Sequence, residues 1–118
     1  MNSSAMLGFL LLVVFSVNFL GDPPINYFHF NPRFGTTQKI IFNTISKDNW
    51  ENEEIHENPL KPGDSFKLDV MFDEDKYKVN LNDEKFGEFK ARIHPLSGVK
   101  AIEVTDQASV RILEVVYF

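Results

Sequence analysis

The chain is built from short runs in which apolar and polar residues alternate. In the clearest run, SFKLDVMF at 65–72, every second side chain is apolar, so one face of an extended segment is apolar. The run at 76–81 repeats this pattern after a turn at 73–76, and Asn82-Asp83 predicts a second turn. No segment of useful length has helical periodicity. The runs predict nine strands, at about 12–20, 26–33, 38–45, 50–56, 65–72, 76–81, 84–90, 99–104 and 110–117. Short, regularly spaced strands without helices predict an all-β, antiparallel β-sandwich.

Length and composition limit the classes of protein to consider. The chain has 118 residues, enough for one domain, and its 43% hydrophobic residues include twelve phenylalanines that can form a core. The net charge of −5, without a basic run, argues against nucleic-acid binding. The absence of cysteine excludes a disulfide framework and thiolate metal sites, and suits a reducing compartment.

The N-terminal segment is almost continuously apolar from Met6 to Phe15. It is too short to cross a bilayer, which takes about 20 residues. One interpretation is a buried strand that runs into FSVNFL. The other is the core of a signal peptide, with Val14 and Ser16 as small residues at cleavage positions. Because no Lys or Arg precedes the apolar run, the strand is favoured. We therefore predict a hydrophobic N-terminal segment at 1–14 and a domain at 15–118.

Polar and aromatic residues alternate in the segment FHFNPRF at 28–34. In a strand, Phe28 and Phe30 point into the core, and His29, Asn31 and Arg33 lie on the opposite face at steps of about 7 Å. The proline between Asn31 and Arg33 cannot donate to a ladder and marks an edge, a bulge or a strand end. Any one of these polar residues is explained by a strand face that is exposed to solvent. A row that combines an imidazole, an amide and a guanidinium is explained less readily in this way.

Two later segments add groups of the same kind. Asn43 follows in KIIFNTI, and the single tryptophan, Trp50, is surrounded by polar residues, which favours an exposed ring. An array of donors and acceptors beside a flat aromatic surface suits a sugar. Glu51 and Glu53 could also be the carboxylate pair of a jelly-roll glycoside hydrolase, a remote alternative. The acidic run at 73–75 lacks the glycine and spaced glutamate of a calcium loop and indicates a turn.

These residues, in this order, resemble the motif of the galectin carbohydrate-recognition domain, the β-galactoside-binding lectins. The family motif is His-x-Asn-Pro-Arg, then an Asn, then Trp-x-x-Glu-x-Arg. This chain has HFNPR at 29–33, Asn43, and WENEEI at 50–55. The resemblance covers residues 15–118 and includes FSVNFL upstream and the hairpin region from 66 to 89 downstream. It implies a galectin/concanavalin-like jelly roll and a lectin that has no catalytic activity, cofactor or metal ion.

The resemblance also implies roles for single residues. His29, Asn31 and Arg33 would bind the axial 4-hydroxyl of galactose, and Arg33 would also reach the ring oxygen. Asn43 and Glu53 would bind the 6-hydroxyl, Glu53 would touch the neighbouring sugar, and the tryptophan would stack on the C–H face of galactose. The predicted carbohydrate site is therefore His29, Asn31, Arg33, Asn43, Trp50 and Glu53. Arg92, in the segment KARIHP, falls in a loop outside the motif.

The chain departs from the family pattern at two places. Ile55 stands where the family has the second arginine, which contacts the second sugar. Only residues 1–14 precede FSVNFL, where the family has about two more strands, so the sandwich lacks N-terminal strands or the leader substitutes for one. Both departures keep open a galectin-like interaction module with weak or lost sugar binding.

The resemblance also suggests partners and a location. The expected partners are β-galactoside-containing glycans on glycoproteins or glycolipids, and a homodimer is one option. The expected location is cytoplasmic, or extracellular by signal-independent export, with a cleaved signal peptide as the less favoured alternative.

Overall fold

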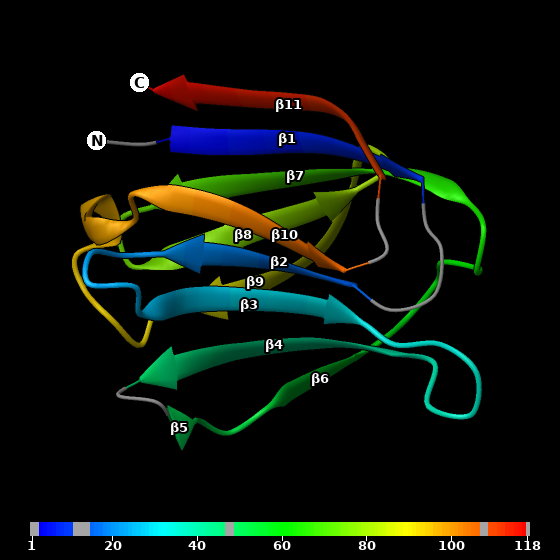
Figure 1. Cartoon of the computed structure of the whole chain (residues 1–118), viewed down its shortest axis with the longest axis horizontal. Helices are drawn as coiled ribbons and strands as arrows, with labels where there is room; N and C mark the ends of the chain where they lie inside the picture. Colours follow the sequence, from blue (N-terminus) through cyan, green and yellow to red (C-terminus); the bar gives the residue numbers. More distant parts are fainter. Residues whose placement is uncertain (1–2, 11–14, 47–48, 107–108, 118) are drawn as a thin grey trace.

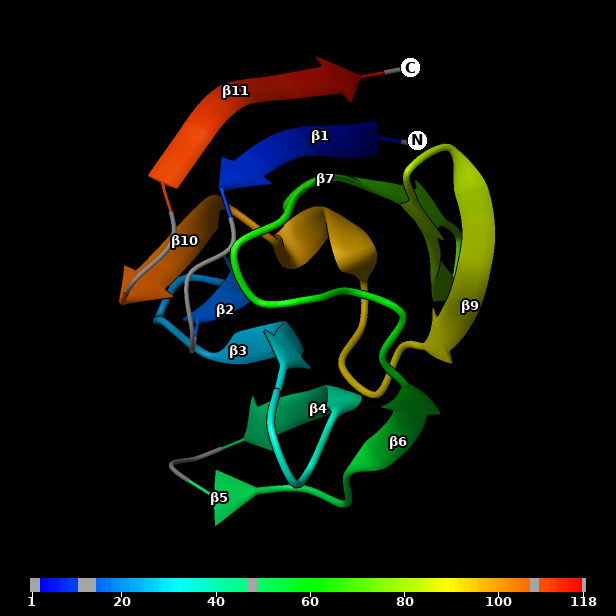
Figure 2. The ribbon, with the colours of Figure 1, turned by 90° about the vertical axis from the view of Figure 1, so that its right-hand side faces the viewer.

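The computed structural model describes the backbone of residues 3–10, 15–46, 49–106 and 109–117. It is a sandwich of two antiparallel sheets (Figures 1 and 2). The five-stranded sheet has the order β11 (Ser109–Tyr117), β1 (Ser3–Leu10), β7 (Ser65–Asp73), β8 (Lys76–Leu81) and β9 (Glu84–Lys90). The other sheet has the order β10 (Ala101–Asp106), β2 (Phe15–Leu20), β3 (Asn26–Pro32), β4 (Lys39–Ser46) and β5 (Asn49–Trp50), with β6 (Glu54–Glu57) also paired to β4. The predicted all-β antiparallel sandwich is confirmed.

Aromatic side chains from the two sheets meet in the core. Phe28 and Phe30 of β3 are fully buried, as their alternation with polar residues predicted. The Phe28 ring centroid lies 4.8 Å from those of Tyr77 and Phe89, on the opposite sheet. The apolar faces of β7 and β8 are also buried, as predicted: Phe66, Leu68, Val70, Phe72, Tyr77, Val79 and Leu81. Because these residues occupy the inner faces, the alternate polar residues must lie on the outer faces of the sheets.

The N-terminal segment contributes a strand to the five-stranded sheet. The backbone of β1 pairs along its whole length with β7 on one side and with β11 on the other. The nine predicted strands therefore become eleven within the described ranges, and one of the added strands precedes FSVNFL. The predicted boundary after residue 14, and the signal-type cleavage position at Val14, lie at residues 11–14, outside the described part of the chain.

The predicted strand at 50–56 is two strands with a bulge between them. The pairs Ile45–Trp50 and Phe42–Glu54 show that β4 advances three residues while its partner advances four. The extra residue interrupts the strand and reverses the alternation of side chains between the two faces of the sheet. In an ideal strand, Trp50 and Glu53 would lie on opposite faces. The bulge brings both to the outer face of the six-stranded sheet.

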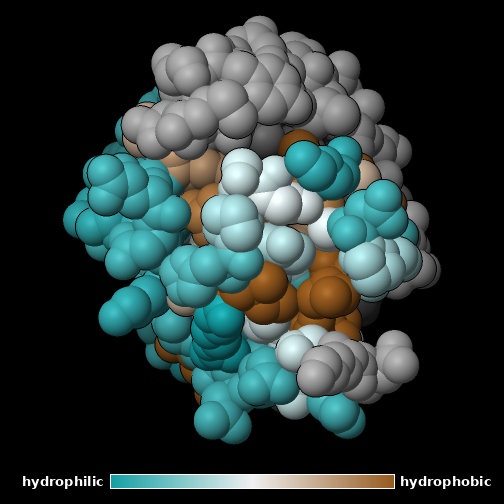
Figure 3. Space-filling model, turned by 90° about the vertical axis from the view of Figure 1, so that its left-hand side faces the viewer, coloured by the Kyte–Doolittle hydropathy of each residue, from teal (hydrophilic) through white to brown (hydrophobic). Residues whose placement is uncertain are grey.

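The two predicted turns are confirmed: the turn at 73–76 joins β7 to β8, and Asn82-Asp83 joins β8 to β9. The 3₁₀ turn Leu96–Gly98 lies between β9 and β10. Pro32 is the last residue of β3, and a strand end was one of its three predicted positions. Within the described residues, no helix is long and apolar enough to cross a membrane. Figure 3 shows one end of the sandwich, where hydrophilic side chains surround a smaller hydrophobic area.

Candidate functional site

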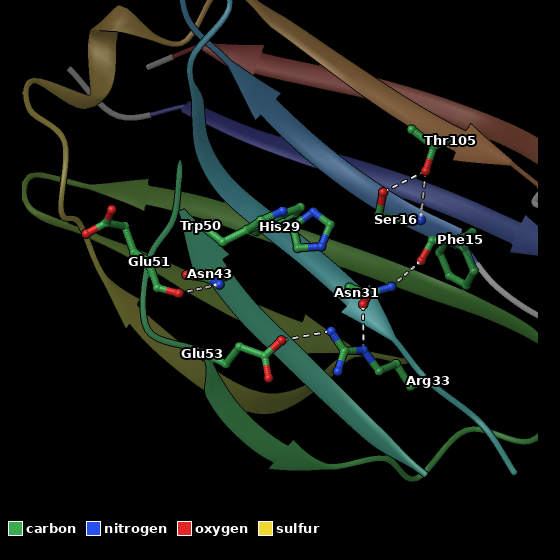
Figure 4. Close-up of a pocket in the computed structure, with 10 residues that line it drawn as sticks. All are labelled: Phe15, Ser16, His29, Asn31, Arg33, Asn43, Trp50, Glu51, Glu53 and Thr105. Carbon is green, nitrogen blue, oxygen red and sulfur yellow. Dashed lines mark hydrogen bonds and ion pairs between the residues drawn. The ribbon is translucent and has the colours of Figure 1, made fainter. Parts of the chain in front are cut away.

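All six predicted site residues line one cavity of about 670 Å³ on the outer face of the six-stranded sheet (Figure 4). The cavity is completed by residues outside the predicted carbohydrate site: Phe15, Ser16, Glu51 and Thr105. Strand β3 contributes His29 and Asn31, Arg33 follows directly after its last residue, and β4 contributes Asn43. Trp50 comes from β5, and Glu53 comes from the bulge before β6. The predicted residues are therefore brought together as a group.

Arg33 connects the two sides of the cavity. Its Nε donates to Asn31 Oδ1 at 2.9 Å, and its Nη2 donates to Glu53 Oε2 at 2.8 Å. Asn31 Nδ2 in turn donates to the carbonyl oxygen of Phe15 at 2.9 Å, which fixes the orientation of the amide. The guanidinium is thus held flat between a fixed amide and a carboxylate, with further N–H groups available for a ligand.

His29 is buried between β2 and the tryptophan. Its Nδ1 lies 2.6 Å from Asn18 Oδ1, and its ring centroid lies 4.7 Å from that of Trp50 in an edge-on arrangement. Burial, assisted by the positive charge of Arg33, lowers the pKa of His29 to about 4, whereas Glu53 opposes the shift. The imidazole is therefore neutral at physiological pH and can both donate and accept a hydrogen bond.

Trp50 is exposed, as its polar neighbours predicted. Trp50 leaves 58% of its surface exposed to solvent, and its ring lies at the edge of the cavity. An exposed ring of this size offers a flat apolar surface beside the polar groups. Ile55 on β6 is also exposed, at 61%. Ile55 pairs with Ile41 on β4, which is buried. Because Ile55 occupies the arginine position of the family motif, that position is apolar here.

The two carboxylates offered for a hydrolase have different surroundings. Glu53 is paired with Arg33, and in Figure 4 the Glu51 carboxylate points away from that pair. The described ranges also contain no group of three or more His, Cys, Asp or Glu side chains placed to hold a metal ion.

The structure adds residues that were not predicted. Asn18 contacts His29, and Arg92, assigned to a loop outside the site, donates to Asn43 Oδ1 at 3.0 Å. The alternation in FSVNFL indicated that Ser16 and Asn18 lie on the outer face of the sheet. The apolar residues that alternate with them are in the core: Phe15, Val17 and Phe19. No local pattern pointed to Arg92, because its partner is 49 positions away in the sequence.

The model of the family described as galactoside-binding lectin matches residues 12–115 of the chain. The chain belongs to the galectins. It is 38% identical to human Galectin-4 over 94 residues, which are 76% of this chain and 29% of that protein. It is 34% identical to the probable galaptin lec-8 of Caenorhabditis elegans over 96 residues, 81% of this chain and 52% of that protein. The chain thus spans about a quarter to a half of the length of these relatives.

Solved galectin structures have the same fold. The crystal structure of Caenorhabditis elegans galectin LEC-6 matches with a TM-score of 0.90 and 24% identity, over 98% of this chain and 82% of that chain. Sheep Galectin-11 in complex with glycerol matches with a TM-score of 0.85 and 22% identity, over 98% of this chain and 90% of that chain. The galectins are lectins, so the chain is a member of a non-catalytic family.

Proposed function

We propose that this galectin domain binds β-galactosides in the cavity on the outer face of its six-stranded sheet. His29, Asn31 and Arg33 would bind the axial 4-hydroxyl of galactose, with Arg33 also near the ring oxygen. Asn43 and Glu53 would bind the 6-hydroxyl. Trp50 would stack on the apolar C–H face of the sugar.

One observation carries the proposal: the exposed Trp50 ring lies beside a row of polar groups whose orientations are already fixed. Fixed donors and acceptors lose little entropy when they bind hydroxyl groups, and a flat ring binds the apolar face of a pyranose. The Arg33–Glu53 ion pair presents a charged donor and a charged acceptor side by side. Hydrogen bonds to charged groups are stronger than neutral ones, and this favours a ligand rich in hydroxyls.

The biological partners follow from this chemistry. We propose β-galactoside-containing glycans of glycoproteins or glycolipids as the ligands, and a homodimer as the assembly that would present two sites. The proposed location is cytoplasmic, or extracellular by signal-independent export. Light scattering of the purified chain tests the dimer, and it is independent of the sugar site.

Retention on immobilised lactose tests the function. The chain is expected to bind the column, to be eluted by free lactose and to remain bound in sucrose, which contains no galactose. A chain that passes through the column unretained would contradict the proposal.

Failure to bind would favour the second candidate, a galectin-like interaction module. The observation behind that candidate is Ile55, an exposed apolar side chain where the family motif has an arginine. An apolar residue there offers no hydrogen bond to a second sugar.

A further inference from the structure

A hydrogen-bonded network lies behind the imidazole of the proposed sugar site. At its centre is the side-chain amide of Asn18 on β2, which is 5% exposed. Its backbone pairs with His29 on β3 and with Glu103 on β10. The amide oxygen accepts from Asn26 Nδ2 at 2.8 Å and lies 2.6 Å from His29 Nδ1. The amide nitrogen donates to Ser16 Oγ and to Glu103 Oε1, both at 3.1 Å.

The carboxylate at one end of this network determines the orientation of the amide. An ionised carboxylate only accepts hydrogen bonds, so the Asn18 NH₂ group must face Glu103. The Asn18 oxygen then faces β3, where Asn26 Nδ2 donates to it, in agreement with this orientation. A reversed amide would place its oxygen against the carboxylate and its NH₂ group against the NH₂ group of Asn26.

The amide orientation in turn determines which nitrogen of His29 carries the proton. An amide oxygen only accepts, so the contact of 2.6 Å requires a hydrogen on His29 Nδ1. The imidazole is neutral, because burial and Arg33 lower its pKa to about 4. A neutral imidazole with hydrogen on Nδ1 has a bare Nε2, which can only accept.

We propose that Asn18 and Glu103 are positioning residues that hold His29 as the Nδ1–H tautomer, so that Nε2 accepts a hydrogen bond from a hydroxyl of the ligand. The identity of that ligand as a sugar rests on the proposed function; the tautomer does not. Arg33, on the same face, supplies only donors. One hydroxyl can thus donate to His29 Nε2 while its oxygen accepts from Arg33, whereas a ligand group with no hydrogen to donate cannot make both contacts.

Nitrogen NMR of the histidine rings, in the ligand-free protein labelled with ¹⁵N, tests the proposal. A ring nitrogen that carries hydrogen and a bare one give separate resonances, and the wild type is expected to show Nδ1–H and a bare Nε2 for His29. Asn18→Ala removes the acceptor, so a mixture of both tautomers is expected. Asn26→Ser is the matched control, since it removes the other donor to the same oxygen and should leave the tautomer unchanged. Glu103→Lys, at an exposed position, replaces an acceptor with a donor, which favours the reversed Asn18 amide. This variant should therefore raise the fraction of His29 that carries hydrogen on Nε2. It serves as the second test if Asn18→Ala does not fold.

Titration of the same variants with methyl β-galactoside separates this inference from the proposed function. Asn18→Ala is expected to weaken binding about tenfold, the equivalent of one lost hydrogen bond, and Asn26→Ser less than twofold. A wild-type His29 with a bare Nδ1, or a Glu103→Lys variant with an unchanged tautomer, would overturn the assigned positioning roles. The predicted tautomer together with no binding of the galactoside would instead refute only the proposed function.

Discussion

Arg92 and Asn43 are 49 positions apart in the sequence, and Arg92 Nη1 donates a hydrogen bond of 3.0 Å to Asn43 Oδ1. The same oxygen accepts from the backbone amide of Thr44 at 2.8 Å, and Asn43 Nδ2 donates to the carbonyl oxygen of Glu51 at 2.9 Å. Both acceptor positions of the Asn43 oxygen are therefore occupied within the protein, and one N–H remains for a ligand. Asn43 thus connects the loop after β9 to the segment that carries Trp50.

Loss of the Arg92 guanidinium should therefore weaken sugar binding indirectly. We expect Arg92→Ala to lower the affinity for methyl β-galactoside by a few fold, through a less ordered Trp50 segment. Arg33→Ala should cost about 1.5–3 kcal/mol, roughly ten- to a hundredfold, because Arg33 would donate charged hydrogen bonds to the ligand. Calorimetric titration measures both variants, with Lys90→Ala, an exposed cation of the same segment, as the control. Equal losses of affinity for Arg33→Ala and Arg92→Ala would contradict the assignment of a direct ligand contact to Arg33 and of an indirect effect to Arg92.

Removal of the Trp50 side chain should abolish measurable lactose binding while the domain still folds. The exposed ring contributes little to the core, but its stacking would be worth about 0.5–1.5 kcal/mol in addition to the apolar area that it covers. Circular dichroism and thermal unfolding check the fold of Trp50→Ala, and calorimetry checks binding. Met71→Ala is the matched control, because Met71 is an exposed apolar side chain on the other sheet. Unfolding of Trp50→Ala would show instead that the ring is part of the core.

The apolar side chain at Ile55 should limit the contribution of a second sugar. We expect wild-type protein to bind lactose only modestly better than methyl β-galactoside. Ile55→Arg should restore a preference for the disaccharide, by about 1.5–3 kcal/mol or roughly ten- to a hundredfold. Both ligands must be titrated against both proteins, since the claim concerns a difference of differences. Ile55→Leu serves as the control. A strong wild-type preference for lactose that Ile55→Arg leaves unchanged would show that another residue contacts the second sugar.

Stability should fall as the pH drops between about 6.5 and 4. His29 titrates near 6.5 in the unfolded chain and near 4 in the fold, so in this range the unfolded state binds the proton first. The contribution of the neutral His29 to the free energy of unfolding is fully present above pH 6.5 and is lost as the pH falls. One unit of pKa corresponds to on the order of 1.4 kcal/mol, so the total loss is roughly 3 kcal/mol. Urea unfolding at pH 7.5 and pH 4.5 measures it. His29→Gln lacks this titration and should have a flatter profile; identical pH profiles would contradict the role of burial.

The alternation of side chains predicted most of the fold and half of the site. Phe28 and Phe30 are in the core and His29 is on the opposite face, because a strand fixes the direction of each side chain. The bulge before Glu53 could not be predicted, since one additional residue in a strand is visible only against its partner strand. The Arg92–Asn43 contact depends on how distant loops are packed, which no local pattern encodes. Ser16 and Asn18, by contrast, lie on a polar face that was readable in FSVNFL.

The central claim is that the row formed by His29, Asn31 and Arg33 recognises the axial 4-hydroxyl of a β-galactoside. Calorimetric titration with methyl β-galactoside and methyl β-glucoside tests it most directly, because these two sugars differ only in the orientation of that hydroxyl. The wild type is expected to bind the galactoside and to show no measurable binding of the glucoside. Equal affinity for the two sugars, or no binding of either, would contradict the claim.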